Sequence, residues 1–264
     1  MIFNIQFYKT SITTKPIADF ILAHEPDVVC LQENFYFSDW HLMTLAPLNL
    51  DKEYFLANDC KAEHVTGNVH LSNTIYVRKK YFNFTQALSN VNLRITDETP
   101  RCSSIIQLFD TKIANVHLSG GRFDDKNFKK LQNHKYLQLK RLIDINDPDI
   151  ILGDFNNENS EAAMMKQLNN YEFYQNLDTL SKDEFINYYY SGSRYLHDQT
   201  DYVPAYNETI IGSTSIFGGT PDWVYVRNQT RLTGRINNFN TIAMELSDHN
   251  AVIVEYLFPI NPNV

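Results

Sequence analysis

The sequence repeats one pattern: an amphipathic helix, an acidic residue followed by Pro-Asp, a short apolar run, and then a carboxylate. The first copy covers residues 15–33 and ends at Glu33, and the second covers residues 124–154 and ends at Asp154. Proline ends each helix because it cannot continue the helical hydrogen bonds, and a short apolar run is typical of a buried strand. Alternating helices and strands predict an α/β fold, in which ligands bind at strand ends. We therefore predict a quasi-duplicated architecture with both carboxylates at strand ends.

Each predicted helix has one apolar face at the helical period. These faces comprise Ile17, Phe20 and Ile21 in the first copy and Phe128, Leu131, Leu139, Leu142 and Ile143 in the second. Alternation and β-branched residues predict further strands over residues 2–7, 73–77, 103–109, 113–118 and 250–258. Residues 178–220 are rich in tyrosine, glycine and serine and are interpreted as a long ordered loop. Its rings either pack against the protein or stack on the bases of single-stranded nucleic acid.

Length and charge limit the possible functions. The chain has 264 residues, 43% of them hydrophobic, and no linker-like or low-complexity stretch, which predicts one domain over residues 1–258 and a polar tail over 259–264. A net charge of −8 disfavours a module that grips duplex DNA through many phosphates, but not an enzyme that acts on phosphates. Without a signal peptide or a membrane-length apolar segment, an intracellular protein is expected. Nothing indicates an obligate protein partner.

The cysteines predict neither a disulfide framework nor a metal clamp. Cys30, Cys60 and Cys102 are odd in number, widely spaced, and form no C-x-x-C motif. This usage is typical of a reducing compartment, and Cys30 is expected to be a small buried residue.

Polar residues recur at the ends of apolar runs. They are Asn4, Glu33, His117, Asp154, Asn156, Asp222, Asp248 and His249. Each one alone could simply cap a turn or satisfy backbone groups. As a set, the carboxylate and amide oxygens are ligands that Mg²⁺ prefers, and histidines beside carboxylates can face a phosphate as cations. The set therefore predicts metal-assisted attack of water on phosphorus.

Several short motifs occur in a fixed order along almost the whole chain. They are FNI at 3–5, LQE at 31–33, NVHL at 115–118, GDFN at 153–156, PDWVYV at 221–226 and SDH at 247–249. In this order and spacing they resemble the endonuclease/exonuclease/phosphatase superfamily of deoxyribonuclease I-like, metal-dependent phosphoesterases. The resemblance implies a four-layer α-β-β-α sandwich, with two mixed β-sheets face to face and helices outside.

The resemblance also implies roles for the polar residues around a bound Mg²⁺, for which Mn²⁺ could substitute. Glu33 would be the principal metal ligand, with Asn4 beside it and Asp248 as a further carboxylate of the metal site. Asp154 would orient or deprotonate the attacking water, and Asn156 would hold a phosphate oxygen.

The remaining roles concern the phosphate group. The resemblance implies that His249 contacts the scissile phosphate and is kept positive by Asp222, and that His117 is a second phosphate donor. Arg101 and Arg122 could also bind phosphate through a bidentate guanidinium, or could be ordinary surface arginines.

The substrate is less constrained than the chemistry. GDFN is followed by Asn157 and Glu158 rather than the ending typical of inositol 5-phosphatases, and Thr220-Pro221 replaces the Arg-Ile usual in exonuclease III-like enzymes. The segment HLSGGRFDDKNFKKLQ is loosely similar to tyrosyl-DNA phosphodiesterases. The leading hypothesis is a Mg²⁺-dependent phosphodiesterase acting on nucleic acid or a nucleotide-linked substrate. The alternatives are a phosphatase or phospholipase C-type enzyme acting on an inositol phosphate or sphingomyelin, and a catalytically dead binding module.

Overall fold

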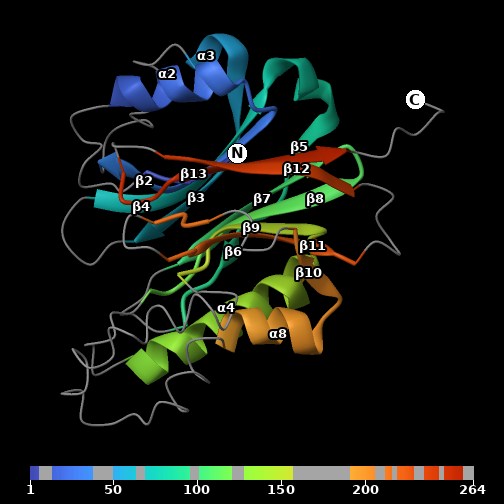
Figure 1. Ribbon diagram of the computed structural model, residues 1–264. Coiled ribbons are helices and arrows are strands. Elements are labelled where there is room, and N and C mark those ends of the chain that lie inside the picture. The colour runs from blue at the N-terminus through green and yellow to red at the C-terminus, as the bar shows by residue number, and fades with distance from the viewer. Residues whose placement is uncertain are drawn as a thin grey trace.

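Two β-sheets packed face to face form the centre of the molecule, and helices cover the outer face of each sheet (Figure 1). The computed structural model describes residues 1–5, 14–37, 50–63, 69–95, 101–120, 128–156, 191–205, 212–215, 219–228, 235–243 and 247–257. Helices α2 (Thr14–His24) and α3 (Leu50–Glu53) lie on one side, and α4 (Phe128–Asn146) and α8 (Ser191–Gln199) lie on the other. The predicted four-layer α-β-β-α sandwich is therefore confirmed.

The first sheet has six strands in the order β12-β13-β1-β2-β4-β3. Their bounds are Arg235–Ile242 (β12), Ala251–Leu257 (β13), Ile2–Asn4 (β1), Val28–Phe37 (β2), Val69–Arg78 (β4) and Tyr54–Glu63 (β3). A 3-10 helix, η2 (Lys79–Phe84), follows β4. β1 and β2 are parallel, whereas the other neighbouring strands are antiparallel, so the sheet is mixed.

The second sheet has seven strands, in the order β10-β11-β9-β8-β7-β5 with β6 paired to β7. Their bounds are Tyr202–Pro204 (β10), Asp222–Arg227 (β11), Ile150–Asp154 (β9), Thr111–His117 (β8), Cys102–Leu108 (β7), Thr85–Ala87 (β5) and Val91–Asn92 (β6). β8 and β9 are its parallel pair among the described strands.

The repeated sequence pattern produces one β-α-β unit in each sheet. Helix α2 connects β1 to its parallel neighbour β2, and α4 connects β8 to its parallel neighbour β9. Parallel neighbours need such a crossover, because the chain must return to the same end of the sheet. Both units therefore deliver their carboxyl ends, and the polar residues placed there, to the same end of the sandwich.

The apolar faces predicted for the two helices are buried where the structure describes them. Ile17 and Ile21 are each 1% exposed in a cluster between α2 and the first sheet. Leu139 and Leu142 are fully buried in the larger cluster that contains the second sheet. The side chains of Phe128 and Leu131 lie outside the described residues.

Two expectations about secondary structure are wrong. Residues 178–220 do not form one long loop, because α8 and β10 lie within them. The sequence of α8 has few strong helix formers, so the helix depends on packing against α4. The ring of Tyr195 contacts the ring of Tyr136 in α4 edge to face, with 4.9 Å between the ring centroids. The apolar strand expected to end before Glu33 instead continues as β2 to Phe37, after a β-bulge between Leu31 and Asn34.

The expectation that no cysteines pair is also wrong. Cys60 in β3 and Cys102 at the start of β7 form a disulfide, with their Cα atoms 6.0 Å apart. The two residues belong to different sheets, so only the packing of the sheets brings them together. Cys30 is a free buried cysteine as predicted, and burial raises the pKa of its thiol to about 12. None of the described helices is long and apolar enough to cross a membrane.

The buried face of α2 gives a test of the packing. Ile21→Ala should lower the free energy of unfolding by about 2–5 kcal/mol, because it removes a buried side chain and leaves a cavity. Ile145→Ala on α4 is the matched control, since Ile145 is 62% exposed, and surface changes usually cost less than about 0.5 kcal/mol. Urea unfolding of the two variants measures the difference, and equal losses would contradict this packing of α2.

Candidate active site

An asparagine amide joins carboxylates from the two sheets. Nδ2 of Asn4, at the end of β1, donates to Oδ2 of Asp154 at 2.8 Å and to Oε1 of Glu33 at 3.4 Å. Asp154 ends β9 in the opposite sheet, and both Asn4 and Asp154 are 1% exposed. The two sequence copies thus bring their carboxylates into one cluster, although only Asp154 stands at a strand end, as predicted for both.

The bulge in β2 explains how Glu33 lies at this cluster although the strand continues past it. Glu33 has a φ of 53°, which is uncommon for a residue with a side chain. Beyond the bulge, Asn34 donates to Thr74 Oγ1 at 3.1 Å and re-anchors β2 on β4. A local irregularity, rather than a strand end, therefore presents the carboxylate.

Gly153 allows β8 and β9 to approach closely just before Asp154. Its φ is 135°, and a Cβ atom built there would lie 2.0 Å from the carbonyl oxygen of Val116. His117 and Asp154 are then direct neighbours in the parallel ladder, with 3.5 Å between Nε2 and Oδ2. His117 Nε2 also lies 3.9 Å from Glu33 Oε1.

A buried histidine–aspartate pair completes the cluster. Asp222, at the start of β11, lies opposite Asp154 in the antiparallel ladder, and its Oδ2 is 2.8 Å from Nδ1 of His249. Nε2 of His249 lies 3.8 Å from Asp154 Oδ2 and 4.0 Å from Asp248 Oδ1. An imidazole between carboxylates satisfies charges that would otherwise repel one another.

Sequence reasoning gave no role to Ser247, which positions this histidine. Its hydroxyl donates to the carbonyl oxygen of Asn4 at 2.7 Å and accepts the backbone N–H of His249 at 3.1 Å. Ser247 is 2% exposed and so ties the histidine loop to β1. Its position in the SDH motif was the only signal of it in the sequence.

The two histidines have opposite protonation tendencies. Burial alone would lower the pKa of His249, but the Asp222 and Asp154 carboxylates outweigh it and raise that pKa to about 10. Burial, reinforced by the positive charges of Arg101 and His249, lowers the pKa of His117 well below its usual value. At neutral pH the site thus holds one imidazolium and one neutral imidazole, and the neutral ring still has one N–H to donate.

The carboxylates hold negative charge at a cost. Burial and the charge of Asp154 raise the pKa of Glu33, and burial also raises the pKa of Asp154. The nearby Arg101 offsets this for Glu33, and its own pKa is lowered by burial. Arg101 Nε is buried and has no hydrogen-bond partner among the described residues. Arg122 lies outside the described residues.

The donor set fits a divalent cation. Asn4, Glu33, Asp154 and Asp248 offer amide and carboxylate oxygens, which Mg²⁺ prefers. Ligand atoms of Asp154, Asp222 and His249 also lie within 4.8 Å of one another, as metal ligands can. The hydrogen bond between His249 and Asp222, and the attraction of the cationic ring for Asp154, already explain why these three residues lie close together. Asp248 reaches the cluster beside His249, with 4.0 Å between its Oδ1 and Nε2 of the ring.

Asn156 holds the turn after β9. Its N–H donates to Asp154 Oδ1 at 2.7 Å, and its side-chain amide donates to the carbonyl oxygen of Leu118 at 3.0 Å. One amide hydrogen is therefore already used in linking the ends of β8 and β9. The second hydrogen of the Asn156 side-chain amide is the one that could donate to a phosphate oxygen.

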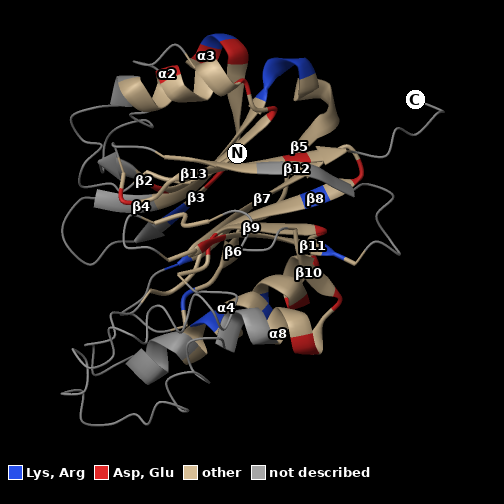
Figure 2. Ribbon diagram, in the orientation of Figure 1, with Lys and Arg blue, Asp and Glu red and all other residues tan. Residues whose placement is uncertain are grey.

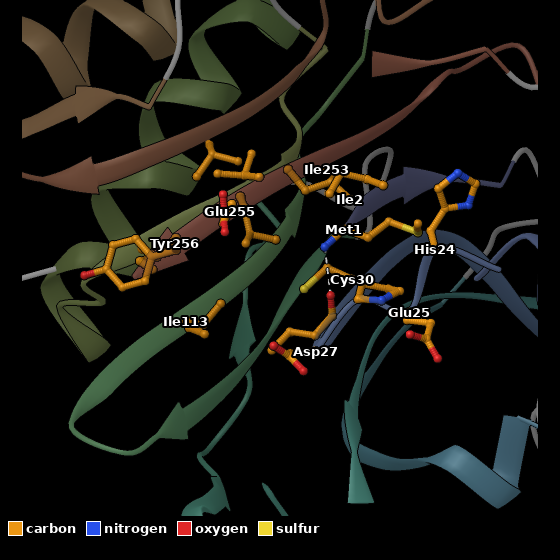
Figure 3. A pocket seen from close by; sticks show the side chains of 16 residues that line it. Met1, Ile2, His24, Glu25, Asp27, Cys30, Ile113, Ile253, Glu255 and Tyr256 are labelled. Atoms are coloured by element: carbon orange, nitrogen blue, oxygen red, sulfur yellow. Dashed lines mark hydrogen bonds between the residues drawn. The ribbon is translucent and has the colours of Figure 1, made fainter. Parts of the chain in front are cut away.

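An apolar cavity of about 410 Å³ opens at the other end of the sandwich (Figure 3). It lies at the beginnings of β1, β2, β8 and β9, with Ile2, Ile113 and Ile150 in its wall. None of the residues of the polar cluster lines it. The polar cluster and this cavity are thus separate features of the fold.

The close approach at Gly153 predicts a sharp steric limit. Gly153→Ala should cost more than about 3 kcal/mol of unfolding free energy, because the new methyl group overlaps the β8 backbone. Gly212→Ala is the control: Gly212 has a φ of 75° with nothing within 4 Å, so only about 1 kcal/mol of backbone strain is expected. Equal costs in chemical denaturation would show that the contact with Val116 is not limiting.

The His249–Asp222 pair predicts a pH-dependent signal. In metal-free protein the folded state keeps His249 protonated, and this contribution to stability is full below the ordinary histidine pKa of 6.5, declines as pH rises, and is gone above about 10. Asp222→Asn should bring deprotonation to lower pH by about 1–3 units, because a carboxylate partner shifts a pKa by that amount. NMR titration of the imidazole measures it, with Asp198→Asn beside the exposed His197 as a control. An unchanged titration of His249 would refute the pairing.

Comparison of the fold with solved structures gives consistent matches at low sequence identity. The catalytic domain of human Nocturnin with a bound sulfate anion has a TM-score of 0.59 and 14% identity, covering 97% of this chain and 93% of that one. A humanized TDP2 from D. rerio gives 0.58 and 14%, covering 97% and 96%. The 3′ phosphatase NExo from Neisseria, bound to a product DNA hairpin, gives 0.62 and 15%, covering 92% and 94%. These matches show a shared fold.

Sequence comparisons separate the family from individual relatives. No curated protein matches the chain. The profile of the endonuclease/exonuclease/phosphatase family matches residues 1–249, which include every residue of the polar cluster. The chain therefore belongs to the endonuclease/exonuclease/phosphatase family, whose members hydrolyse phosphate esters.

Proposed function

We propose that this protein is a Mg²⁺-dependent phosphodiesterase that hydrolyses a phosphodiester in nucleic acid or in a nucleotide-linked substrate. The observation that carries the proposal is the meeting of Asn4, Glu33 and Asp154 with the His249–Asp222 pair at one end of the sandwich. Attack of water on a phosphate ester requires oxygen ligands for a metal ion and a cationic hydrogen-bond donor to the phosphate, and this cluster offers both.

A divalent cation would be held by Glu33, Asn4 and Asp248. Their oxygens suit Mg²⁺, and the raised pKa of Glu33 shows that its negative charge lacks full compensation by the protein. When bound, the cation would supply Lewis-acid polarisation of a phosphate oxygen.

Asp154 is the residue best placed to orient the attacking water and to take its proton. One oxygen accepts the Asn156 N–H and the other accepts the Asn4 amide, so the carboxylate is fixed in orientation. Burial raises its pKa, which brings a carboxylate closer to the pH at which it works as a base.

The two histidines then divide the work at the phosphate. His249 carries a positive charge held by Asp222, and that charge stabilises the oxygens of the five-coordinate phosphorus transition state. His117 would donate a hydrogen bond from a neutral ring, and Arg101 would add a cation beside Glu33 and Asp154.

The substrate class rests on the relatives and on charge. A 3′ phosphatase of the same fold, bound to a DNA hairpin, favours a substrate that contains nucleotides. Acidic and basic residues are mixed over both helical layers of the described chain (Figure 2), which favours a short or single-stranded substrate over a long duplex. A phosphomonoesterase is the second candidate, because one of these relatives is a 3′ phosphatase.

Asp154→Asn and His249→Ala test the assigned roles. Each should lower kcat by a factor of about 100 or more with KM changed only a few-fold, since both groups act mainly in the transition state. Asp198→Asn is the control that should keep full activity. The substrates are abasic DNA, 5′-tyrosyl DNA, poly(A) RNA, inositol phosphates and sphingomyelin, each with Mg²⁺ and with EDTA.

Three results of this panel would be decisive. Cleavage of a nucleic-acid substrate with Mg²⁺ but not with EDTA is the expected one. Activity on inositol phosphates or sphingomyelin alone would favour the alternative enzyme class, and no cleavage of any ester would contradict the proposed function. Full activity in either variant would refute the role of that residue.

A further inference from the structure

Helix α4 buries polar side chains against the end of the second sheet that carries the site. Lys135 and Gln138 are fully buried, although they lie on a helix whose other inward residues include Leu139 and Leu142. Lysine is almost never fully buried, because removing an ammonium ion from water is costly. The two residues are three positions apart and so project from the same side of the helix.

Each of these side chains holds the exit of a different strand. The ammonium group of Lys135 donates to the carbonyl oxygen of Asn156, two residues after the end of β9. Gln138 accepts the backbone N–H of Ser119 at 2.9 Å and donates to its hydroxyl at 2.8 Å, two residues after the end of β8. One face of α4 therefore grips both strand exits.

The two exits are also bonded to each other. The N–H of Leu118 donates to the carbonyl oxygen of Asp154 at 2.9 Å. The side-chain amide of Asn156 donates to the carbonyl oxygen of Leu118 at 3.0 Å. Asn156 has a φ of 49°, an uncommon conformation that its surroundings must hold in place. In that conformation its N–H reaches Oδ1 of Asp154 at 2.7 Å.

We infer that Lys135, supported by Gln138, is a positioning residue for the hydrolysis proposed above. It holds Asn156 from the carbonyl side while the carboxylate of Asp154 holds it from the amide side. Fixing this residue fixes the orientation of Asp154 and keeps its second oxygen directed toward Asn4 and the histidines. The inference rests on the proposed function for its kinetic consequence, but its structural consequence can be measured without any substrate.

Stability distinguishes positioning from simple packing. Replacing the buried lysine with an apolar side chain of similar length removes the desolvation cost of the ammonium ion but leaves the Asn156 carbonyl without this donor, so only a small net change in stability is expected. Groups retained for function commonly show this trade-off, with activity lost while stability is kept. A buried lysine that mattered only for packing would give the opposite result, with stability lost and the activity of the folded fraction kept.

Lys135→Met is the test, with Lys140→Met as its matched control. Lys140 lies on the same helix, is exposed, and pairs with Asp144 at the surface. The measurements are kcat and KM for bis(p-nitrophenyl) phosphate with Mg²⁺, the urea midpoint, and the amide exchange rate of Asn156 by NMR. We expect Lys135→Met to lower kcat about 10- to 100-fold with KM within about three-fold, since small misplacements cost this much.

The same variant should exchange the Asn156 amide about ten-fold faster while its urea midpoint changes little. Lys135→Arg should restore part of kcat, because it keeps a donor to the Asn156 carbonyl. Lys140→Met should match the wild type in every measurement. A lowered midpoint with kcat unchanged in the folded fraction would overturn the inference.

Failure of the proposed function can be told apart from failure of this inference. If the wild type cleaves no phosphate ester, the proposed function fails and amide exchange alone decides, and unchanged exchange at Asn156 overturns the inference. If Lys135→Met does not fold, Gln138→Met takes its place, since it removes both the acceptor for the Ser119 N–H and the donor to the Ser119 hydroxyl. Unchanged Ser119 exchange and unchanged kcat in Gln138→Met would likewise overturn it.

Discussion

The side-chain amide of Asn4 between Glu33 and Asp154 is the contact on which the site depends. The buried carboxylate of Asp154 and the half-buried carboxylate of Glu33 repel each other, and this repulsion would push the ends of the two sheets apart. One amide that donates to both carboxylates holds the sheets in contact at this end. Burial raises the pKa of both acids, so a cation beside them would stabilise their charged forms.

Around this bridge, each further residue is fixed by backbone geometry. The bulge in β2 presents Glu33, the absence of a side chain at Gly153 brings His117 beside Asp154, and Ser247 links the histidine loop to β1. These are short-range constraints in the two β-α-β units and in the loop before β13. The site is therefore built on rigid strands, and the helices act on it through a few buried polar side chains, as α4 does.

Much of this could be predicted from the sequence, because the relevant signals are local or repeated. The helix–Pro-Asp–strand pattern predicted the two units, and the apolar periodicity predicted which faces of α2 and α4 are buried. The roles given to the polar residues remain proposals, although the structure gathers Asn4, Glu33, His117, Asp154, Asp222, Asp248 and His249 at one end. The disulfide, helix α8 and the continuation of β2 were missed, since each depends on contacts between segments far apart in the chain.

The sequence by itself determined the chemistry available: oxygen ligands, histidines and their order along two repeated units, together with the fold class. The tertiary structure alone decided the charge states, because burial and neighbouring carboxylates make His249 cationic and His117 neutral although both are histidines. It also decided that Lys135 points inward at Asn156 rather than toward water. Desolvation and Coulomb interactions depend on distances across the sandwich, and those distances exist only once the sheets have packed.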